Sequence, residues 1–373
     1  MSKYKVLIAA GGTGGHVYPA IAIADALVDT GKDLEINFVG TRDRMEWNAV
    51  PKAGYDIHPI WISGLHRRLT FKNLLFPVKL MVSLVQCYFL LKRLKPDVVV
   101  SCGGFASGPI GWVAGKLNIP LVLQEQNSFP GVTTRKLGPM AERIFIAFED
   151  AKKNFPADKT ELCGNPTRKK ITDGDRKQAL GDFNFTNKKD KTLLILGGSG
   201  GAKTVNEAVF KNLGKLHDDL NLQIIWQCGD IYYDDLHVKI DEKHFENVRL
   251  HPFLYEMPHA YAAADLVISR AGALSCAELM LTGKPSILIP SPTVAGDHQT
   301  KNAESMVQNG ASILLKDKDA IESLYDAVKG VITKEEKLRS MSEAAKKLAR
   351  PDAANVIARQ IIELAGQNRE RNS

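Results

Sequence analysis

Residues 5–20 read KVLIAAGGTGGHVYPA, which is a short apolar run, a glycine-rich turn and the expected start of a helix. The apolar run is typical of a buried parallel strand. The four glycines within Gly11–Gly15 let the backbone turn sharply and approach a ligand, because they carry no Cβ atom. Ala20–Val28 is the predicted helix, with Pro19 near its first turn, where a missing N–H has no cost. His16 stands where the turn meets the helix.

This turn predicts a site for an anion or a sugar. The free N–H groups and the positive end of the helix dipole favour a phosphate or a developing oxyanion. No G-x-G-x-x-G register fits Gly11–Val17, and no Gly-Lys-Ser/Thr follows, so neither the dinucleotide fingerprint nor the P-loop is present. The alternative is that the glycines only permit tight packing and that His16 is a structural hydrogen-bond partner.

The totals favour a two-domain globular protein without disulfide bonds. A chain of 373 residues is too long for one typical core and fits two α/β domains. We expect no signal peptide, because Met1–Lys5 leads straight into the first predicted strand. The cysteines form no C-x-x-C pair, so we expect buried thiols of a reducing compartment rather than disulfides or zinc ligands. They are Cys87, Cys102, Cys163, Cys228 and Cys276.

The positive charge is concentrated in one region. The net charge is +7, and residues 51–100 carry eight basic and two acidic side chains. Apolar residues are interspersed with basic ones over 66–95, and the longest uncharged run, Leu80–Leu91, is shorter than the roughly 20 residues that span a bilayer. This predicts binding to an anionic membrane surface. The alternative is a core-facing helix with solvated lysines at its ends. Few aromatic residues lie among the basic ones, so we expect no nucleic acid partner.

Strand and helix patterns alternate through the first half of the chain, which predicts a parallel, doubly wound sheet. Three loops, Gly11–His16, Gly103–Pro109 and Glu125–Asn127, each follow a predicted strand. They are therefore expected to converge at the carboxyl ends of the strands. The predicted strands are 5–10, 35–39, 55–62, 97–101 and 121–124, and the predicted helices are 20–28, 44–53 and 79–95.

A second copy of the opening pattern begins at Lys191–Leu196, where an apolar strand precedes GGSGGA at residues 197–202. The repeat predicts two Rossmann-like domains that face each other across a cleft. The predicted boundaries are 1–164 for the first domain, 165–350 for the second, and 351–373 for a C-terminal helix that crosses back to the first domain and ends in a frayed tail from Gln367.

Seven motifs occur in one order along the chain, and the set resembles the MurG family, the transferases that move N-acetylglucosamine from UDP to undecaprenyl-pyrophosphoryl-muramoyl-pentapeptide. The resemblance covers residues 3–365 and implies a GT-B glycosyltransferase fold. The motifs are GGTGGHVYPA (11–20), CGGFASGP (102–109), QEQN (124–127), GNPTR (164–168), GGSGGA (197–202), SRAGALSCAEL (269–279) and DHQTKNA (297–303).

The resemblance implies a reaction and a place for it. N-acetylglucosamine passes with inversion from UDP-GlcNAc to the 4-hydroxyl of the N-acetylmuramic acid of lipid I, giving lipid II for peptidoglycan at the cytoplasmic face of the bacterial inner membrane. We expect no cofactor and no metal. The pairs Asp173/Asp175 and Asp317/Asp319 have the spacing of metal ligands, but they are expected to be solvated surface residues. Helix N-termini are expected to neutralise the diphosphate instead.

The matching positions imply the site residues. Glu278 is expected to accept hydrogen bonds from the ribose hydroxyls, and Gln299 to hold sugar hydroxyls. His16 and Glu125 are both candidates for the base, because a free imidazole titrates near neutrality and burial can raise the pKa of a carboxyl. The implied substrate-binding positions are Thr13, Gly14, Gly15, Asn127, Arg168, Ser199, Leu254 (by its backbone), Ala273, Leu274, Ser275, Cys276, Ala277, Glu278 and Gln299.

Other readings stay open from the sequence. Another UDP-sugar enzyme of the same fold, such as a glycolipid glycosyltransferase or a UDP-GlcNAc 2-epimerase, shares these features, because fold alone does not fix function. A nicotinamide dehydrogenase lacks its fingerprint here, and a non-catalytic membrane binder would explain only the basic region. Two positions depart from the family: Phe105, where tyrosine is common, and Gly200, where glutamine or arginine is common.

Overall fold

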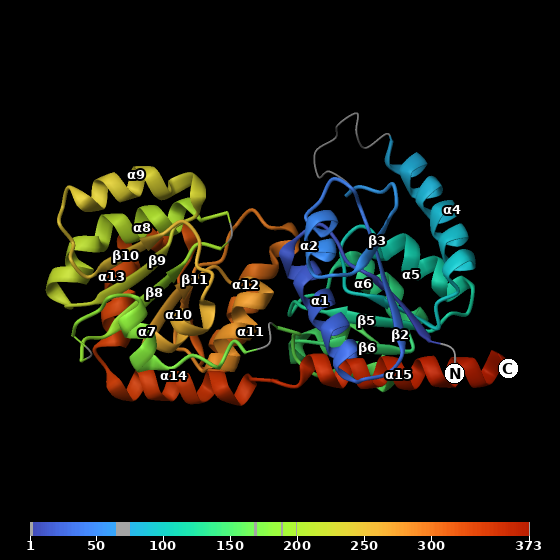
Figure 1. Ribbon diagram of the computed structural model, residues 1–373. Coiled ribbons are helices and arrows are strands. Elements are labelled where there is room, and N and C mark those ends of the chain that lie inside the picture. The colour runs from blue at the N-terminus through green and yellow to red at the C-terminus, as the bar shows by residue number, and fades with distance from the viewer. Residues whose placement is uncertain (1–2, 65–74, 168–169, 188, 199, 373) are drawn as a thin grey trace. The chain divides into compact units, whose positions relative to one another are not determined.

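The chain divides into two compact units, each built on one parallel sheet (Figure 1). Unit 1 holds residues 1–168 and 350–373, and unit 2 holds residues 169–349. The prediction of two doubly wound, parallel-sheet domains is confirmed. This computed structural model describes residues 3–64, 75–167, 170–187, 189–198 and 200–372.

The sheet of unit 1 has the strand order β3-β2-β1-β4-β5-β6-β7, and all of its neighbours pair in parallel. The chain winds outward in both directions from β1, so the β1/β4 boundary is the topological switch point at which doubly wound sheets bind ligands. The strands are β1 (Tyr4–Ala9), β2 (Leu34–Gly40), β3 (Asp56–Pro59), β4 (Val98–Ser101), β5 (Leu121–Glu125), β6 (Arg143–Ile146) and β7 (Thr160–Leu162).

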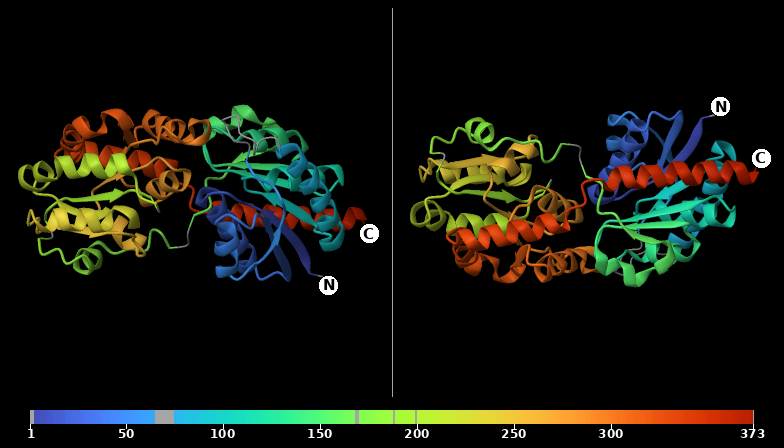
Figure 2. Two further views of the ribbon diagram at one scale, coloured as in Figure 1. Left: turned by 90° about the horizontal axis from the view of Figure 1, so that it is seen from above. Right: turned by 90° about the horizontal axis from the view of Figure 1, so that it is seen from below.

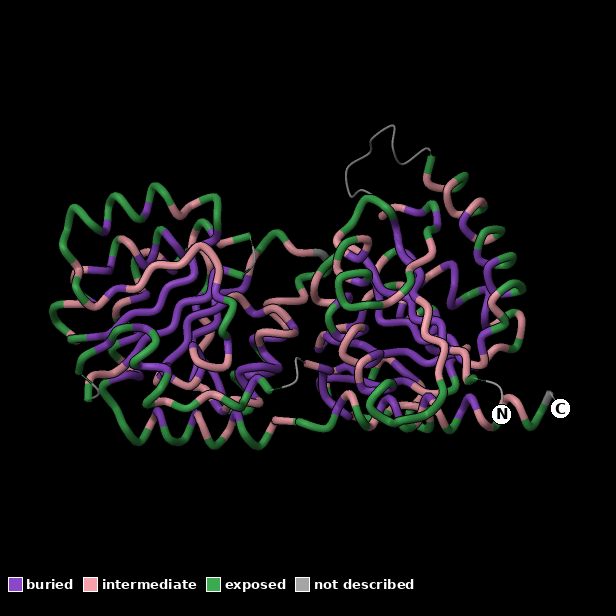
Figure 3. Tube along the Cα trace, in the orientation of Figure 1, coloured by how far each residue is buried: buried purple, intermediate pink, exposed green. Residues whose placement is uncertain are grey.

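Apolar side chains cover both faces of this sheet, and its central strands are buried (Figure 3). Val6 and Ile8 of β1 pack toward α1 and α15, whereas Leu7 and Ala9 pack toward α4 and α5. This alternation follows from the twofold period of a strand and explains why β1 reads as a continuous apolar run. The helices are α1 (Gly14–Asp29), α2 (Glu46–Lys52), α4 (Phe76–Leu94), α5 (Ser107–Lys116), α6 (Val132–Leu137) and α15 (Ala353–Asn372), with 3₁₀ turns at Gly138–Met140, Glu149–Asn154 and Ala157–Lys159.

Helix α1 begins earlier than the sequence predicts. It starts at Gly14, so Pro19 lies inside the helix and not in its first turn. Proline has no N–H to donate to the carbonyl four residues before it, which here belongs to Gly15. The boundary was misplaced because glycine is a weak helix former, and the two glycines read as turn rather than as helix.

Helix α4 is apolar on two sides. Cys87, Leu90 and Leu91 are buried against the sheet, as expected of a core-facing helix. The opposite side is also apolar, with Met81 64% and Phe89 66% exposed. The core-facing alternative therefore describes the inner side of α4, and membrane binding by its exposed side stays a prediction. Among the described residues, no helix is long and apolar enough to cross a membrane.

Helix α15 belongs to unit 1 (Figures 1 and 2). Its Ile357, Ala358 and Ile361 side chains pack against α1 and the sheet. The sequence predicts a frayed tail from Gln367, but the helix continues to Asn372. The Arg369 side chain explains this, because its Nε and Nη2 atoms donate to the Asp97 carboxylate at 3.0 and 2.7 Å.

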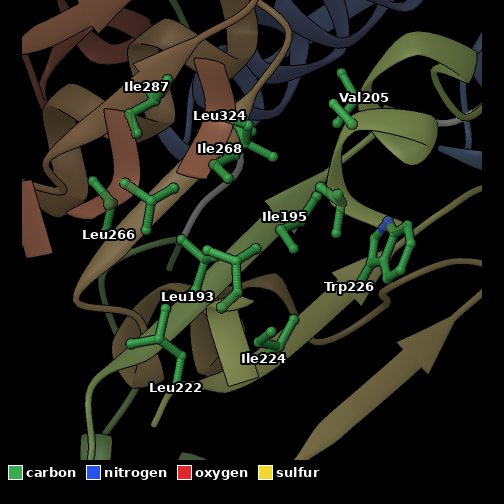
Figure 4. Close-up of a cluster of buried hydrophobic side chains, with 14 of the residues drawn as sticks. Leu193, Ile195, Val205, Leu222, Ile224, Trp226, Leu266, Ile268, Ile287 and Leu324 are labelled. Atoms are coloured by element: carbon green, nitrogen blue, oxygen red, sulfur yellow. The ribbon is translucent and has the colours of Figure 1, made fainter. Parts of the chain in front are cut away.

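Unit 2 repeats the arrangement with the strand order β10-β9-β8-β11-β12-β13, again all parallel. Side chains of β8 and β9 pack with α8 and α13 into one apolar core (Figure 4). The elements are α7 (Arg176–Asp182), β8 (Thr192–Leu196), α8 (Lys203–Gly214) continued by a π turn (Lys215–Asp219), β9 (Gln223–Gln227), α9 (Asp230–Asp241), β10 (Val248–His251), α10 (Met257–Ala263), β11 (Leu266–Ser269), α11 (Ala273–Thr282), β12 (Ser286–Leu288), α12 (His298–Gln308), β13 (Ser312–Leu314), α13 (Ala320–Ile332) and α14 (Glu335–Leu348), with 3₁₀ turns at Ala295–Asp297 and Asp317–Asp319.

The Arg369 contacts generate a stability prediction. Arg369→Ala removes two charge-assisted hydrogen bonds to Asp97 and a cation–π contact with Tyr4, whose ring centroid lies 4.4 Å from the guanidinium carbon. We expect the free energy of unfolding of unit 1 to fall by about 1–3 kcal/mol. Arg371→Ala, an exposed arginine of the same last turn, is the matched control. Equal melting curves for the two variants by calorimetry would show that α15 is not anchored through Arg369.

Candidate active site

The first glycine turn joins β1 to α1 and holds His16 beside the start of the helix. Gly12 adopts a φ of +90°, which favours glycine, and its N–H donates to a carboxylate oxygen of Glu46 at 3.0 Å. Thr13 is the N-cap of α1 in an extended conformation. Its hydroxyl does not cap the helix but lies 3.1 Å from the Nδ1 atom of His16. The hydroxyl therefore orients the imidazole.

The N-terminus of α1 offers backbone donors. In the first turn of a helix, no helical carbonyl lies four residues earlier to accept a hydrogen bond. The N–H groups of Gly14 and Gly15 therefore have no acceptor within α1. They lie at the positive end of a helix dipole of 16 residues. This geometry suits an anionic group, as the glycine-rich turn in the sequence predicts.

The second glycine turn, between β4 and α5, touches the first. A Cβ atom on Gly103 would lie 2.9 Å from the His16 Nε2 atom, and a Cβ atom on Gly104 would lie 2.7 Å from the Gly11 carbonyl carbon. Both glycines have positive φ values, +96° and +86°. The Ser107 hydroxyl lies within hydrogen-bond distance of the last carbonyl of β1, at 3.2 Å. These contacts fix the two turns against each other.

Glu125 organises the third loop. It is 2% exposed, and it accepts hydrogen bonds from the Asn127 N–H at 3.0 Å, the Asn127 side-chain amide at 3.2 Å and the Gly131 N–H at 3.1 Å. Burial raises the pKa of Glu125, and these hydrogen bonds oppose the rise. Gln126 donates to the Cys102 carbonyl at 2.7 Å, which joins this loop to the second glycine turn. The predicted convergence of the three loops is confirmed.

Unit 2 has its own glycine turn between β8 and α8. Gln227, the last residue of β9, accepts from the Gly197 N–H at 3.0 Å and donates from its side chain to the Gly198 carbonyl at 3.1 Å. A Cβ atom on Gly229 would lie 2.6 Å from the Gly201 Cα atom. This turn is therefore fixed by the strand next to it in the sheet.

Glu278 lies in the second turn of α11 and is 7% exposed. Its carboxylate accepts a hydrogen bond from the buried Tyr261 hydroxyl at 3.0 Å. The sequence gives no local signal for this pairing, because Tyr261 belongs to α10. The hydrogen bond from Tyr261 fixes the orientation of this buried carboxylate.

The remaining predicted positions differ in accessibility. Leu274 and Ser275 are partly exposed near the start of α11, whereas Cys276 and Ala277 are buried, so only their backbone could meet a ligand. Gln299 is half-buried, and its side-chain oxygen accepts from the Ser291 N–H at 2.8 Å. Four predicted positions remain: Ala273 and Leu254 are both buried, and Arg168 and Ser199 lie outside the described residues.

One expectation about acidic residues is wrong. Asp317 was expected to be solvated, but it forms an ion pair with Arg270 and accepts a hydrogen bond from the Thr204 hydroxyl at 3.0 Å. Arg270 also donates to the Ile289 carbonyl at 3.0 Å. The sequence could not place Asp317 beside a residue 47 positions away. Within the described parts of the chain, no three His, Cys, Asp or Glu side chains form a cluster that could hold a metal.

Comparison with known proteins agrees with these features over the whole chain. The glycosyltransferase family 28 N-terminal domain matches residues 6–146, and the C-terminal domain of that family matches residues 192–357. Relatives from Flavobacterium psychrophilum and Salinibacter ruber are 45% and 43% identical over 366 and 367 residues, which is 98% of each chain. Both are named UDP-N-acetylglucosamine--N-acetylmuramyl-(pentapeptide) pyrophosphoryl-undecaprenol N-acetylglucosamine transferase.

Solved structures give the same result. The crystal structure of Acinetobacter baumannii MurG superposes with a TM-score of 0.79 at 28% identity, covering 97% of this chain and 100% of that one. A UDP-N-acetylglucosamine 2-epimerase superposes with a TM-score of 0.66 at 16% identity over 98% of this chain and 97% of that one, which shows the shared fold alone. The chain is a glycosyltransferase of family 28 and belongs to the MurG family.

Proposed function

We propose that this protein transfers N-acetylglucosamine from UDP-GlcNAc to the 4-hydroxyl of the N-acetylmuramic acid of lipid I, giving lipid II. The observation that carries the proposal is identity of 45% across nearly the full length of a relative named for this transfer. The epimerase alternative rests on fold alone, because the epimerase structure is only 16% identical in sequence to this chain.

The donor is proposed to bind to unit 2. Glu278, oriented by Tyr261, would accept from the ribose hydroxyls, and Gln299 would hold hydroxyls of the sugar. The Leu254 backbone would meet uracil, and the start of α11 would face the nucleotide. The remaining donor contacts are assigned by family resemblance to Arg168, Ser199 and the stretch 273–277.

The acceptor is proposed to react beside the loops of unit 1. The acceptor oxygen bonds to C1 of N-acetylglucosamine as the C1–O bond to UDP breaks, the hydroxyl proton moves to a base, and negative charge collects on the departing diphosphate. The N–H groups of Gly14 and Gly15 would stabilise that charge. Asn127, held by Glu125, would contact the donor sugar.

Of the two candidates for the base, the contacts favour His16. Both Glu125 oxygens already accept hydrogen bonds from Asn127 and Gly131, which supports a role in holding the loop. The His16 Nδ1 atom lies 3.1 Å from the Thr13 hydroxyl, and the imidazole ring lies against Gly103 of the second glycine turn. An imidazole held beside the start of α1 in this way is proposed to take the proton of the acceptor hydroxyl.

The reaction itself is tested with UDP-GlcNAc, a chelator and a short-chain lipid I analogue, with products identified by mass spectrometry. We expect disaccharide-lipid and UDP to form in equal amounts and at an undiminished rate with the chelator. Consumption of UDP-GlcNAc without the acceptor would favour the epimerase, and absence of product would reject the proposed acceptor.

Replacing the base separates chemistry from binding. His16→Ala is expected to lower kcat by about 10²–10⁴-fold, the usual contribution of a general base, while UDP affinity changes less than about threefold. His58→Ala, on the edge strand β3 of the same sheet, is the control and should keep wild-type kcat. An equal loss of UDP affinity and kcat in the His16 variant would contradict a base role.

The exposed side of α4 is proposed as the membrane-binding face. It presents Val78, Met81, Val85, Tyr88 and Phe89, all more than two-fifths exposed. Cations lie over aromatic rings around it, with Lys79 over Trp61 at 5.6 Å, Lys92 over Tyr88 at 5.8 Å and Lys116 over Trp112 at 5.6 Å. Such a combination suits the headgroup region of an anionic bilayer, where the lipid-linked acceptor resides.

Introducing negative charge on this apolar face tests membrane binding. Met81→Glu combined with Phe89→Glu should reduce sedimentation with phosphatidylglycerol vesicles at least about tenfold, because two carboxylates must then enter an anionic interface. UDP affinity should not change. Ile231→Glu combined with Val238→Glu, on the exposed side of α9, is the matched control. Equal sedimentation of both double variants would exclude α4 as the membrane-binding face.

A further inference from the structure

Three acidic or basic side chains are buried among the described residues, namely Glu46, Glu125 and Glu278. Each lies near the carboxyl edge of a sheet. Burying a carboxylate is unfavourable unless its oxygens accept good hydrogen bonds, so each of these residues needs a reason. Glu125 holds Asn127, and Glu278 is bonded by Tyr261. Glu46 is the one to which neither the sequence motifs nor the proposed function gives a role.

The Glu46 carboxylate joins the ends of two neighbouring strands. One oxygen accepts from the Gly12 N–H at 3.0 Å. The other accepts from the N–H and the hydroxyl of Thr41, which directly follows β2, at 3.1 and 2.8 Å. The nearby arginines are engaged elsewhere, because Arg44 pairs with Asp43 and Arg42 lies over the Trp47 ring. The negative charge is thus balanced by three hydrogen-bond donors.

The surrounding glycines are fitted to this carboxylate. A Cβ atom on Gly11 would lie 2.7 Å from a Glu46 oxygen, and one on Gly40 would lie 2.7 Å from the Glu46 Cγ atom. On its other side, the Gly11 backbone abuts Gly104 of the second glycine turn. The first turn is therefore clamped between the second turn and Glu46, which holds it by the hydrogen bond from the Gly12 N–H.

We infer that Glu46 is a positioning residue for the transfer reaction, an inference that rests on the proposed function. By fixing the Gly12 N–H, Glu46 sets the direction in which the chain enters α1. That direction places the Gly14 and Gly15 N–H groups and the His16 imidazole. A displacement of such groups by about 1 Å can cost about a hundredfold in rate.

The test compares two isosteric substitutions: one replaces the Glu46 carboxylate, and the other removes one of the donors that bond to it. In Glu46→Gln, the amide must turn an NH₂ group toward either the Gly12 N–H or the Thr41 N–H, and two donors then oppose each other. In Thr41→Val, the carboxylate loses one donor on the side away from the turn and keeps the Gly12 bond. We expect Glu46→Gln to lower kcat by about 10–100-fold and Thr41→Val by less than about threefold.

Two readouts separate positioning from stability. UDP affinity should stay within about twofold in both variants, because Glu46 belongs to unit 1, whereas the uracil and ribose contacts are proposed in unit 2. Amide hydrogen exchange in peptides covering residues 10–17 should be faster in Glu46→Gln than in Thr41→Val, with both variants folded. Equal losses of kcat in step with equal losses of melting temperature would overturn the inference, as would unchanged kcat and exchange in Glu46→Gln.

Two further measurements apply if Glu46→Gln does not fold or if the proposed reaction is wrong. Should Glu46→Gln not fold, Glu46→Asp is measured instead, because it keeps the charge but cannot reach both Gly12 and Thr41. The same loss of kcat and local gain in exchange is then expected, and wild-type values would overturn the inference. If the wild-type protein makes no product from lipid I, the proposed function fails. Independently of that result, unchanged amide exchange at residues 10–17 in the Glu46 variant would show that Glu46 does not hold the first glycine turn.

Discussion

The close approach of two backbone turns governs the active region of unit 1. Gly11 after β1 and Gly104 after β4 lie so near each other that a side chain on Gly104 would overlap the Gly11 backbone. Because the turns cannot separate without breaking the β1/β4 boundary, the N-terminus of α1 is fixed at the switch point of the sheet. The His16 ring then packs on Gly103, and its position follows from the fold.

The two units solve the same packing problem differently. In unit 2, the glycine turn after β8 packs directly on Gly229, which follows the neighbouring strand β9. In unit 1, the corresponding space beside the turn after β1 is filled by the Glu46 carboxylate, which bridges to Thr41 after β2. A backbone contact leaves no charge in the site, whereas the carboxylate adds a buried acceptor that orients an N–H group. Internal repetition of sequence therefore does not imply repetition of chemistry.

The sequence predicted the features that depend on periodicity and glycine. Both sheets, the repeat and the meeting of the three loops followed from apolar runs placed directly before turns. The features it missed depend on contacts between distant residues. Arg270 with Asp317, Tyr261 with Glu278 and Arg369 with Asp97 each join elements whose proximity only the folded chain creates. Local propensity also misplaced the start of α1, because tertiary packing holds Gly14 and Gly15 in a helix that they disfavour alone.

The apolar outer side of α4 has no explanation in the folding of unit 1. Its inner stripe already joins the core through Leu90 and Leu91, and a helix that is apolar on all sides is normally buried on all sides. Helix α4 packs on α5, which starts at Ser107 directly after the second glycine turn and carries the exposed Trp112. The proposed membrane-binding face is thus linked through α5 to the second glycine turn, against which His16 lies. An acceptor anchored in the bilayer would then meet the reacting groups at a height set by the packing of α4 on α5.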